Sequence, residues 1–164
     1  MEILLILNLI ITIIYLTISC IKVKRVPESI SETSYMWEEN CKEKGQWHTA
    51  YLFSIYCFLT AGLLFFPWLY TTPILYQFLV FIGCLGIIAA GITPFFKNNN
   101  SWIHYIGGIV ALLCGLIWIS LNSPFIIILI SFLIFIILSF WKPNSYIFFG
   151  EVIGLFTLIL VLLI

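Results

Sequence analysis

Apolar residues fall into six long blocks that short polar breaks separate. The blocks cover roughly residues 3–21, 49–69, 73–93, 103–121, 124–141 and 146–164. Each is about as long as the roughly 20 residues that a helix needs to cross a bilayer. Because the connections between most blocks are short, consecutive helices are expected to be antiparallel neighbours. The pattern predicts an all-α integral membrane protein, a six-transmembrane-helix antiparallel bundle that forms one domain over residues 1–164.

The one long polar stretch, residues 22–48, holds five of the seven basic residues and five of the seven acidic ones. It is too short to be a separate domain. Tyr35, Trp37 and Trp47 are interspersed with its charges, and aromatic rings of this kind favour the headgroup depth of a bilayer. The stretch is therefore predicted to be a polar loop on the membrane interface. The alternative is a mobile loop in which the aromatic residues have no such role.

The composition supports a membrane location and gives an orientation. Hydrophobic residues make up 63% of the chain and charged residues only 9%, with seven bases balanced by seven acids, so no net charge attracts nucleic acid. All seven bases fall in loops 22–48, 94–102 and 142–145. Under the positive-inside rule these loops are predicted to be cytoplasmic, and both termini are predicted to lie outside a cell membrane that the chain crosses several times.

Signatures of catalysis and metal binding are sparse. The five cysteines show no CxxC pair and lie mostly in apolar blocks, so they are interpreted as small buried hydrophobes without disulfides. The chain has no Asp, and its two His lack a spaced partner, which makes a metal site a weak hypothesis. No GxSxG, P-loop or GxGxxG motif occurs. We therefore assign no catalytic residue, no metal and no cofactor from the sequence.

Small residues recur every four positions in two of the blocks. One series is Gly107, Ala111 and Gly115, and the other is Gly150 and Gly154. Each series lies along one helix face, where small side chains let helix backbones approach closely in a membrane. These five positions are predicted to pack against neighbouring helices. Chance spacing in apolar segments that contain glycine is the alternative.

One acid and one histidine fall within the apolar blocks, on the side of the basic loops. Glu151 is the only acid well inside a block, and His104 lies near the start of the fourth. A carboxyl at that depth needs a partner, because an unpaired charge in the bilayer is costly. Glu151 is therefore expected to face inward, toward His104 or a folded-back part of the first loop.

A candidate binding cavity follows from this placement. Its predicted lining residues are Glu151, His104, Tyr35, Trp37 and Tyr105. The alternative is a single buried hydrogen bond from Glu151 to the backbone or to a tyrosine, with no cavity and no ligand. For His104 the alternative is an interfacial side chain that donates a hydrogen bond to a carbonyl.

Short motifs over about half of the chain resemble a known membrane family. They are VPESISETSY in the first loop and GIIAAGITPFFKNNNSWIHYIGG across the third and fourth blocks. They resemble the DRAM/Frag/Sfk-type six-helix membrane proteins and similar bacterial domains of unknown function. The positions that carry the resemblance are Pro27, Ile30, Ser31, Gly86, Gly91, Pro94, His104, Gly107 and Gly108. The resemblance implies a compact six-helix bundle with no established catalytic activity. It also implies a first loop outside the cytosol, opposite to the count of basic residues.

The leading hypothesis is a small polytopic membrane protein with an accessory, sensor or lipid-binding role and no clear catalytic signature. Its expected partner is membrane lipid, with a second copy or another membrane protein possible and no nucleic acid. An oligomeric pore or effector is one alternative, although a pore usually carries a polar stripe and the fifth block offers only Ser131 and Ser139. A membrane enzyme that acts on a lipid through His104 and Glu151 is the other.

Overall fold

The protein is all-helical over the residues that the computed structural model describes, which are 1–32, 51–92 and 101–164, and no strand occurs in these ranges. Short 3-10 turns precede two of the helices. The elements in chain order are α1 (Glu2–Val23), α3 (Leu52–Thr71), η2 (Ile74–Tyr76), α4 (Gln77–Ile92), α5 (Ser101–Asn122), α6 (Phe125–Trp141), η4 (Pro143–Ser145) and α7 (Tyr146–Leu163).

Each predicted apolar block corresponds to one helix. Five of the helices in the described ranges are long and apolar enough to cross a membrane, whereas α6 has 17 residues and is shorter than the others. The prediction of an all-helical chain with several possible membrane spans is therefore confirmed. That all six helices span a membrane stays a prediction.

Prolines set the start of several of these elements. Pro73 and Pro124 occupy the N-cap positions of η2 and α6, and Pro143 lies in the first turn of η4. A proline lacks an N–H and restricts the residue before it, so it ends one helix and is tolerated at the start of the next. These breaks create the hairpins that bring distant parts of the chain together.

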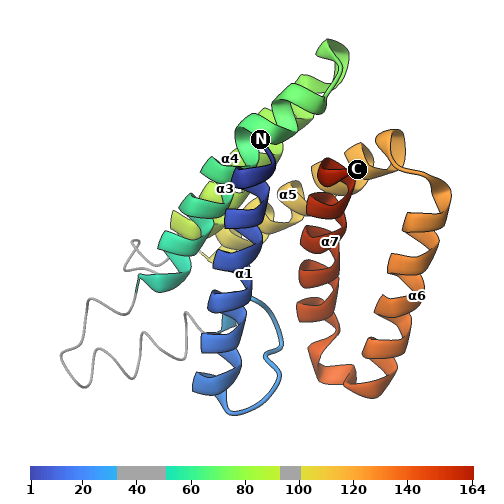
Figure 1. Ribbon diagram of the computed structural model, residues 1–164. Helices are drawn as coiled ribbons and strands as arrows, with labels where there is room; N and C mark the ends of the chain where they lie inside the picture. Colours follow the sequence, from blue (N-terminus) through green and yellow to red (C-terminus); the bar gives the residue numbers. More distant parts are fainter. Residues whose placement is uncertain (33–50, 93–100) are drawn as a thin grey trace.

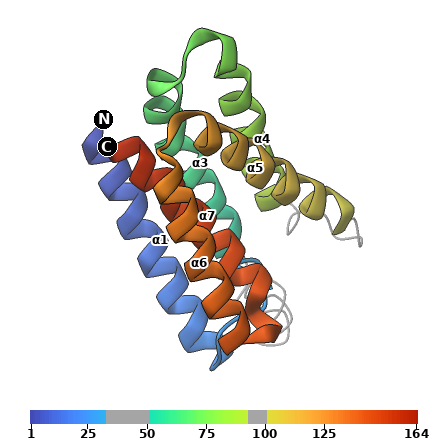
Figure 2. The same cartoon turned by 90° about the vertical axis from the view of Figure 1, so that its right-hand side faces the viewer.

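The helices form two groups that diverge toward one end of the molecule. Helices α1, α6 and α7 run side by side, whereas α4 and α5 incline away from them, and α3 contacts both α1 and α4 (Figures 1 and 2). Both termini lie at the opposite end from the described part of the first loop (Figure 1). Helix α5 also contacts α7, so these two helices connect the groups.

The expectation that consecutive helices are close neighbours is wrong for one pair. Helices α3 and α4, α4 and α5, and α6 and α7 pack together, but α6 touches α5 only marginally. Helix α6 instead lies at the edge of the fold with no buried residue, and Ser131 on it hydrogen-bonds Thr157 on α7 at 2.8 Å. The connection at Ser123 and Pro124 directs α6 away from α5.

The described part of the first loop folds back onto α7. Pro27 is fully buried and Ile30 is buried. The backbone N–H of Phe148 donates to the carbonyl of Glu28 at 2.9 Å, and the Ser145 hydroxyl donates to the carbonyl of Val26 at 3.3 Å. Residues 24–32 are thus packed against the bundle, whereas the rest of the predicted interfacial loop, residues 33–48, lies outside the described ranges.

Candidate functional site

Glu151 is held by the folded-back loop. It lies on the second turn of α7, and its Oε2 accepts a hydrogen bond from the backbone N–H of Ile30 at 2.7 Å. Because a hydrogen bond to an ionised group is stronger than a neutral one, this contact stabilises both the loop and the carboxylate. The expected inward orientation toward the first loop is observed, but the partner is a backbone amide and not a basic side chain.

Aromatic residues on two helices support the loop at this point. The Tyr15 hydroxyl on α1 donates to the Ile30 carbonyl at 3.1 Å, and the Tyr15 ring stacks on Tyr56 of α3 with the ring centroids 4.2 Å apart. Ile30 therefore presents its N–H to α7 while its carbonyl is bound by α1. Two helices and the loop fix the position of the Glu151 carboxyl group.

His104 approaches the same region from α5. The side chain is buried, and Nδ1 lies 3.0 Å from the Ala90 carbonyl on α4, to which a protonated Nδ1 donates. The ring also packs against Phe53 of α3, with the ring centroids 5.7 Å apart. His104 therefore connects α4 and α5 and also lines the cavity described next. Its contact with a backbone carbonyl agrees with the alternative stated from the sequence.

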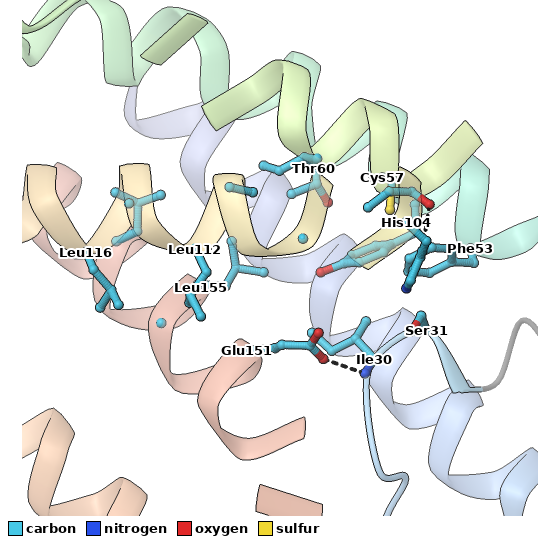
Figure 3. A pocket seen from close by; sticks show the side chains of 18 of the residues that line it. Ile30, Ser31, Phe53, Cys57, Thr60, His104, Leu112, Leu116, Glu151 and Leu155 are labelled. Carbon is cyan, nitrogen blue, oxygen red and sulfur yellow. Dashed lines mark hydrogen bonds between the residues drawn. The ribbon is translucent and has the colours of Figure 1, made fainter. Parts of the chain in front are cut away.

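A cavity of about 150 Å³ lies between α3, α5 and α7 and has one polar end. At that end Glu151 and His104 project into the same space from different helices, beside Ile30 and Ser31 (Figure 3). Away from it the walls are mainly apolar, with the polar groups of Thr60 and Trp68 as exceptions. The lining residues beyond the polar end include Cys57, Ile87, Ala111, Leu112, Gly115, Leu116, Ile119, Gly154, Leu155 and Leu158.

Two glycines on α5 leave the space open. A Cβ added to Gly108 or to Gly115 would have no atom within 4 Å, and both residues line the cavity. Leu112 and Leu116, which also line it, are 38% and 45% exposed at the surface of the helix group. The cavity therefore reaches the lateral surface of the protein between α5 and α7.

The opposite face of α5 is in tight contact with α4. A Cβ on Gly86 would lie 2.7 Å from the Gly107 carbonyl oxygen and 2.8 Å from the Ala111 nitrogen, and a Cβ on Gly107 would lie 2.7 Å from the Gly86 oxygen. Real Cβ atoms do not approach backbone that closely, so only glycine fits at these two positions.

The structure separates the predicted cavity residues into three cases. Glu151 and His104 line one cavity. Tyr105 does not, and its assignment is wrong: one residue step turns it about 100° around α5 from His104, and it is 63% exposed. Tyr35 and Trp37 lie outside the described residues.

The predicted packing positions also differ in what lies opposite them. Gly107 and Ala111 pack against α4 as expected, Gly154 faces Leu112 with an added Cβ 3.2 Å from that side chain, and Gly150 faces Phe135 at 3.5 Å. Gly115 is buried, yet no atom lies near its missing Cβ, so its assignment as a packing residue is wrong. Its spacing matches the series, and α4 still lies beside α5 at that height, where a Cβ added to Gly83 would be 3.2 Å from Cys114 Cβ. Gly115 instead faces the cavity.

Sequence reasoning missed the residues that complete the polar end. Ile30, Ser31, Phe53 and Tyr56 all line the cavity. The signals for Ile30 and Ser31 were their place in the motif of the resemblance and the expected contact of Glu151 with a folded-back part of the first loop. Within the described ranges, no three His, Cys or Glu side chains are grouped so as to hold a metal ion.

Comparisons of the chain with protein-family models, with curated proteins and with solved structures give no match. The functional interpretation therefore depends on the geometry of the cavity.

Proposed function

We propose that this chain is a polytopic protein of the cell membrane that binds the hydrocarbon chain of a lipid in the cavity between α3, α5 and α7, without catalysing a reaction. The supporting observation is a pre-formed cavity whose walls are mainly apolar and which brings Glu151 and His104 together at one end. Small-molecule sites typically combine apolar walls with a few placed polar groups. An amphiphilic lipid likewise has an apolar chain and a polar head at one end.

The length of the cavity suits an extended chain. Its lining residues on α5 run from His104 to Ile119, which is about 22 Å at about 1.5 Å per residue. That distance is most of the roughly 30 Å hydrocarbon thickness of a bilayer. A cavity of about 150 Å³ encloses a group about the size of benzene, so part of an extended chain would lie inside it and the rest in the lateral opening beside Leu112 and Leu116.

The exposed Leu112 and Leu116 support entry from the side. A lipid that moves between these side chains would pass from the bilayer into the cavity without crossing water. Its hydrocarbon chain would stay in apolar surroundings throughout the transfer.

The lipid-binding proposal is tested by filling the cavity. In Gly115→Leu the new side chain occupies the space that the lipid chain would use. If it displaces two methylenes, affinity for a C16 amphiphile falls about tenfold, because each buried methylene contributes about 0.8 kcal/mol. The measurement is a titration of the detergent-purified protein with a fluorescent C16 lipid.

Gly62→Leu is the matched control. Gly62 is also a helical glycine with open space around its missing Cβ, but it is exposed on α3 and does not line the cavity. We expect its affinity to equal that of the wild type. Equal binding by Gly115→Leu would contradict the proposal.

A membrane enzyme that acts on a lipid is the second candidate, because Glu151 and His104 line one cavity. Both side chains hold backbone groups, since Glu151 accepts from Ile30 and His104 contacts the Ala90 carbonyl. These contacts suit positioning better than proton transfer. Recovery of a chemically altered lipid after incubation with the wild type would favour the enzyme over the binding protein.

The proposed topology places loops 22–48, 94–102 and 142–145 in the cytoplasm and both termini outside. Under this orientation, Cys41 in intact cells resists a membrane-impermeant thiol reagent and reacts after permeabilisation. A cysteine at Leu75, which is 70% exposed between α3 and α4, reacts at once. Cys41→Ser gives the background from the other thiols. The reverse pattern would invert the orientation and leave the lipid-binding proposal intact.

A further inference from the structure

We propose that the cavity selects an amphiphile whose head donates hydrogen bonds and carries no negative charge, namely a long-chain amine or alcohol, and that Glu151 receives this head. The proposal deepens the lipid-binding function and depends on it. It adds the chemistry of the headgroup, which the apolar walls alone do not specify.

The charged residues around the cavity disfavour an anionic head. Glu151 is the one carboxyl among the lining residues that the structure describes, and none of these residues is Lys or Arg. A phosphate or carboxylate head placed beside an ionised Glu151 would meet a like charge, and the described lining offers no Lys or Arg to balance it; His104, at the same end, contacts the Ala90 carbonyl through Nδ1. Arginine and lysine are the usual partners of such anionic groups.

Arg25, a base in the described part of the first loop, is already engaged. The guanidinium of Arg25 bonds the Glu32 carboxylate and lies 3.5 Å from Glu28 Oε1. The backbone N–H of Glu28 also donates to Glu32 Oε2 at 2.5 Å. This network fixes Arg25 within its own segment, so its charge is compensated there and does not favour an anion in the cavity.

Glu151 can accept further hydrogen bonds from a ligand. A carboxylate accepts at about four lone-pair positions, and the Ile30 N–H uses one of them. The rest of the group faces a cavity with mainly apolar walls (Figure 3). An ammonium or hydroxyl head would donate to the acceptor positions of Glu151 that the Ile30 N–H does not use, and a hydrogen bond to a charged group is among the stronger ones.

The depth of Glu151 fits the head of a lipid. It lies five residues after the start of α7, about 7 to 8 Å along the helix, at the end of the cavity where the first loop crosses. The apolar lining continues from there toward Leu158 and Ile119. A head at Glu151 therefore leaves its chain along the apolar part of the cavity.

The test compares four lipids with the same C16 chain and different heads: a primary amine, an alcohol, a carboxylate and a phosphate. Each competes with the fluorescent C16 lipid for the purified full-length protein. We expect the amine and the alcohol to bind at least about tenfold more tightly than the two anions, the scale of one hydrogen bond to a charged group. This comparison uses the wild type alone and does not depend on any variant folding.

Glu151→Gln then tests the assigned residue. We expect it to lose the advantage of the amine over the anionic lipids while it still binds the C16 chain. Glu2→Gln is the matched control, because Glu2 is an exposed carboxyl at the start of α1 away from the cavity, and we expect it to keep the wild-type order.

The outcomes separate the two proposals. If none of the four lipids competes, lipid binding itself is overturned. If all four bind equally, or the anions bind best, the headgroup proposal is overturned and lipid binding stands. If the wild type shows the predicted order and a folded Glu151→Gln protein keeps it, the role of Glu151 is overturned.

Discussion

The two sides of α5 show opposite uses of small residues. On the side of α4, Gly107 and Gly86 bring the two backbones so close that an added Cβ would lie 2.7 Å from backbone oxygen. On the side of α7, Gly115 is equally small, but an added Cβ would meet no atom within 4 Å. One helix therefore combines a tight interface with an open cavity, although the two glycines are only eight residues apart.

The difference comes from how the partner helices run. Helices α4 and α5 stay together along their length, whereas α7 belongs to the group that diverges from them (Figure 2). A small residue permits close approach but does not cause it. Where the partner diverges, the same residue leaves space that a ligand can fill.

The strongest test of the tight side is Gly107→Ala. The added methyl would strike the backbone of Gly86 and Ala90, which cannot swing aside as a side chain can. We expect the free energy of unfolding to fall by about 1–3 kcal/mol, the usual cost of overpacking. Thermal unfolding in detergent measures the effect, and an unchanged stability would show that α4 and α5 are not in backbone contact.

The second test concerns the hydrogen bond from the Ile30 N–H to Glu151, at the polar end of the cavity. Glu151→Leu removes the acceptor of the Ile30 N–H, so we expect that amide to exchange its hydrogen about tenfold faster or more, the scale of one charged hydrogen bond. Hydrogen exchange of the purified protein measures it. Glu151→Gln retains an oxygen acceptor and is expected to protect the amide better than Leu does. Equal protection in all three proteins would show that Glu151 does not hold the loop.

The sequence predicted the helices well because the apolar runs are long and most of the breaks between them contain proline, asparagine or lysine. It also predicted that Glu151 faces inward, since the cost of an unpaired charge in an apolar block does not depend on the details of packing. It could not predict the partner of Glu151. The Ile30 amide lies 121 residues away in sequence, and any backbone N–H can donate.

The spacing of small residues could not separate Gly107 from Gly115 for a similar reason. A step of four residues defines a helix face but not what lies opposite that face. Tyr105 is a second example. It is next to His104 in sequence, but the turn of the helix directs its side chain outward, away from the cavity.

A weaker effect is expected at Gly154, where α7 faces α5. A Cβ there would lie 3.2 Å from the Leu112 Cδ1 atom, the end of a flexible and partly exposed side chain. Because Leu112 can change rotamer, we expect Gly154→Ala to lower the unfolding free energy by less than about 1 kcal/mol. Thermal unfolding beside Gly107→Ala measures the difference. A loss as large as that of Gly107→Ala would show that α5 and α7 are as tightly packed as α4 and α5.

The smallest change is expected from Gly115→Ala, and its sign is opposite to that of Gly107→Ala. The new methyl meets no atom within 4 Å, so it adds no clash, and alanine favours a helix over glycine by up to about 1 kcal/mol. We therefore expect the unfolding temperature to stay the same or rise slightly. Gly62→Ala, at an open and exposed glycine of α3, gives the effect of helix propensity without the cavity. If Gly115→Ala instead destabilised the protein as Gly107→Ala does, α5 would be packed on both faces and the cavity would not exist in the folded protein.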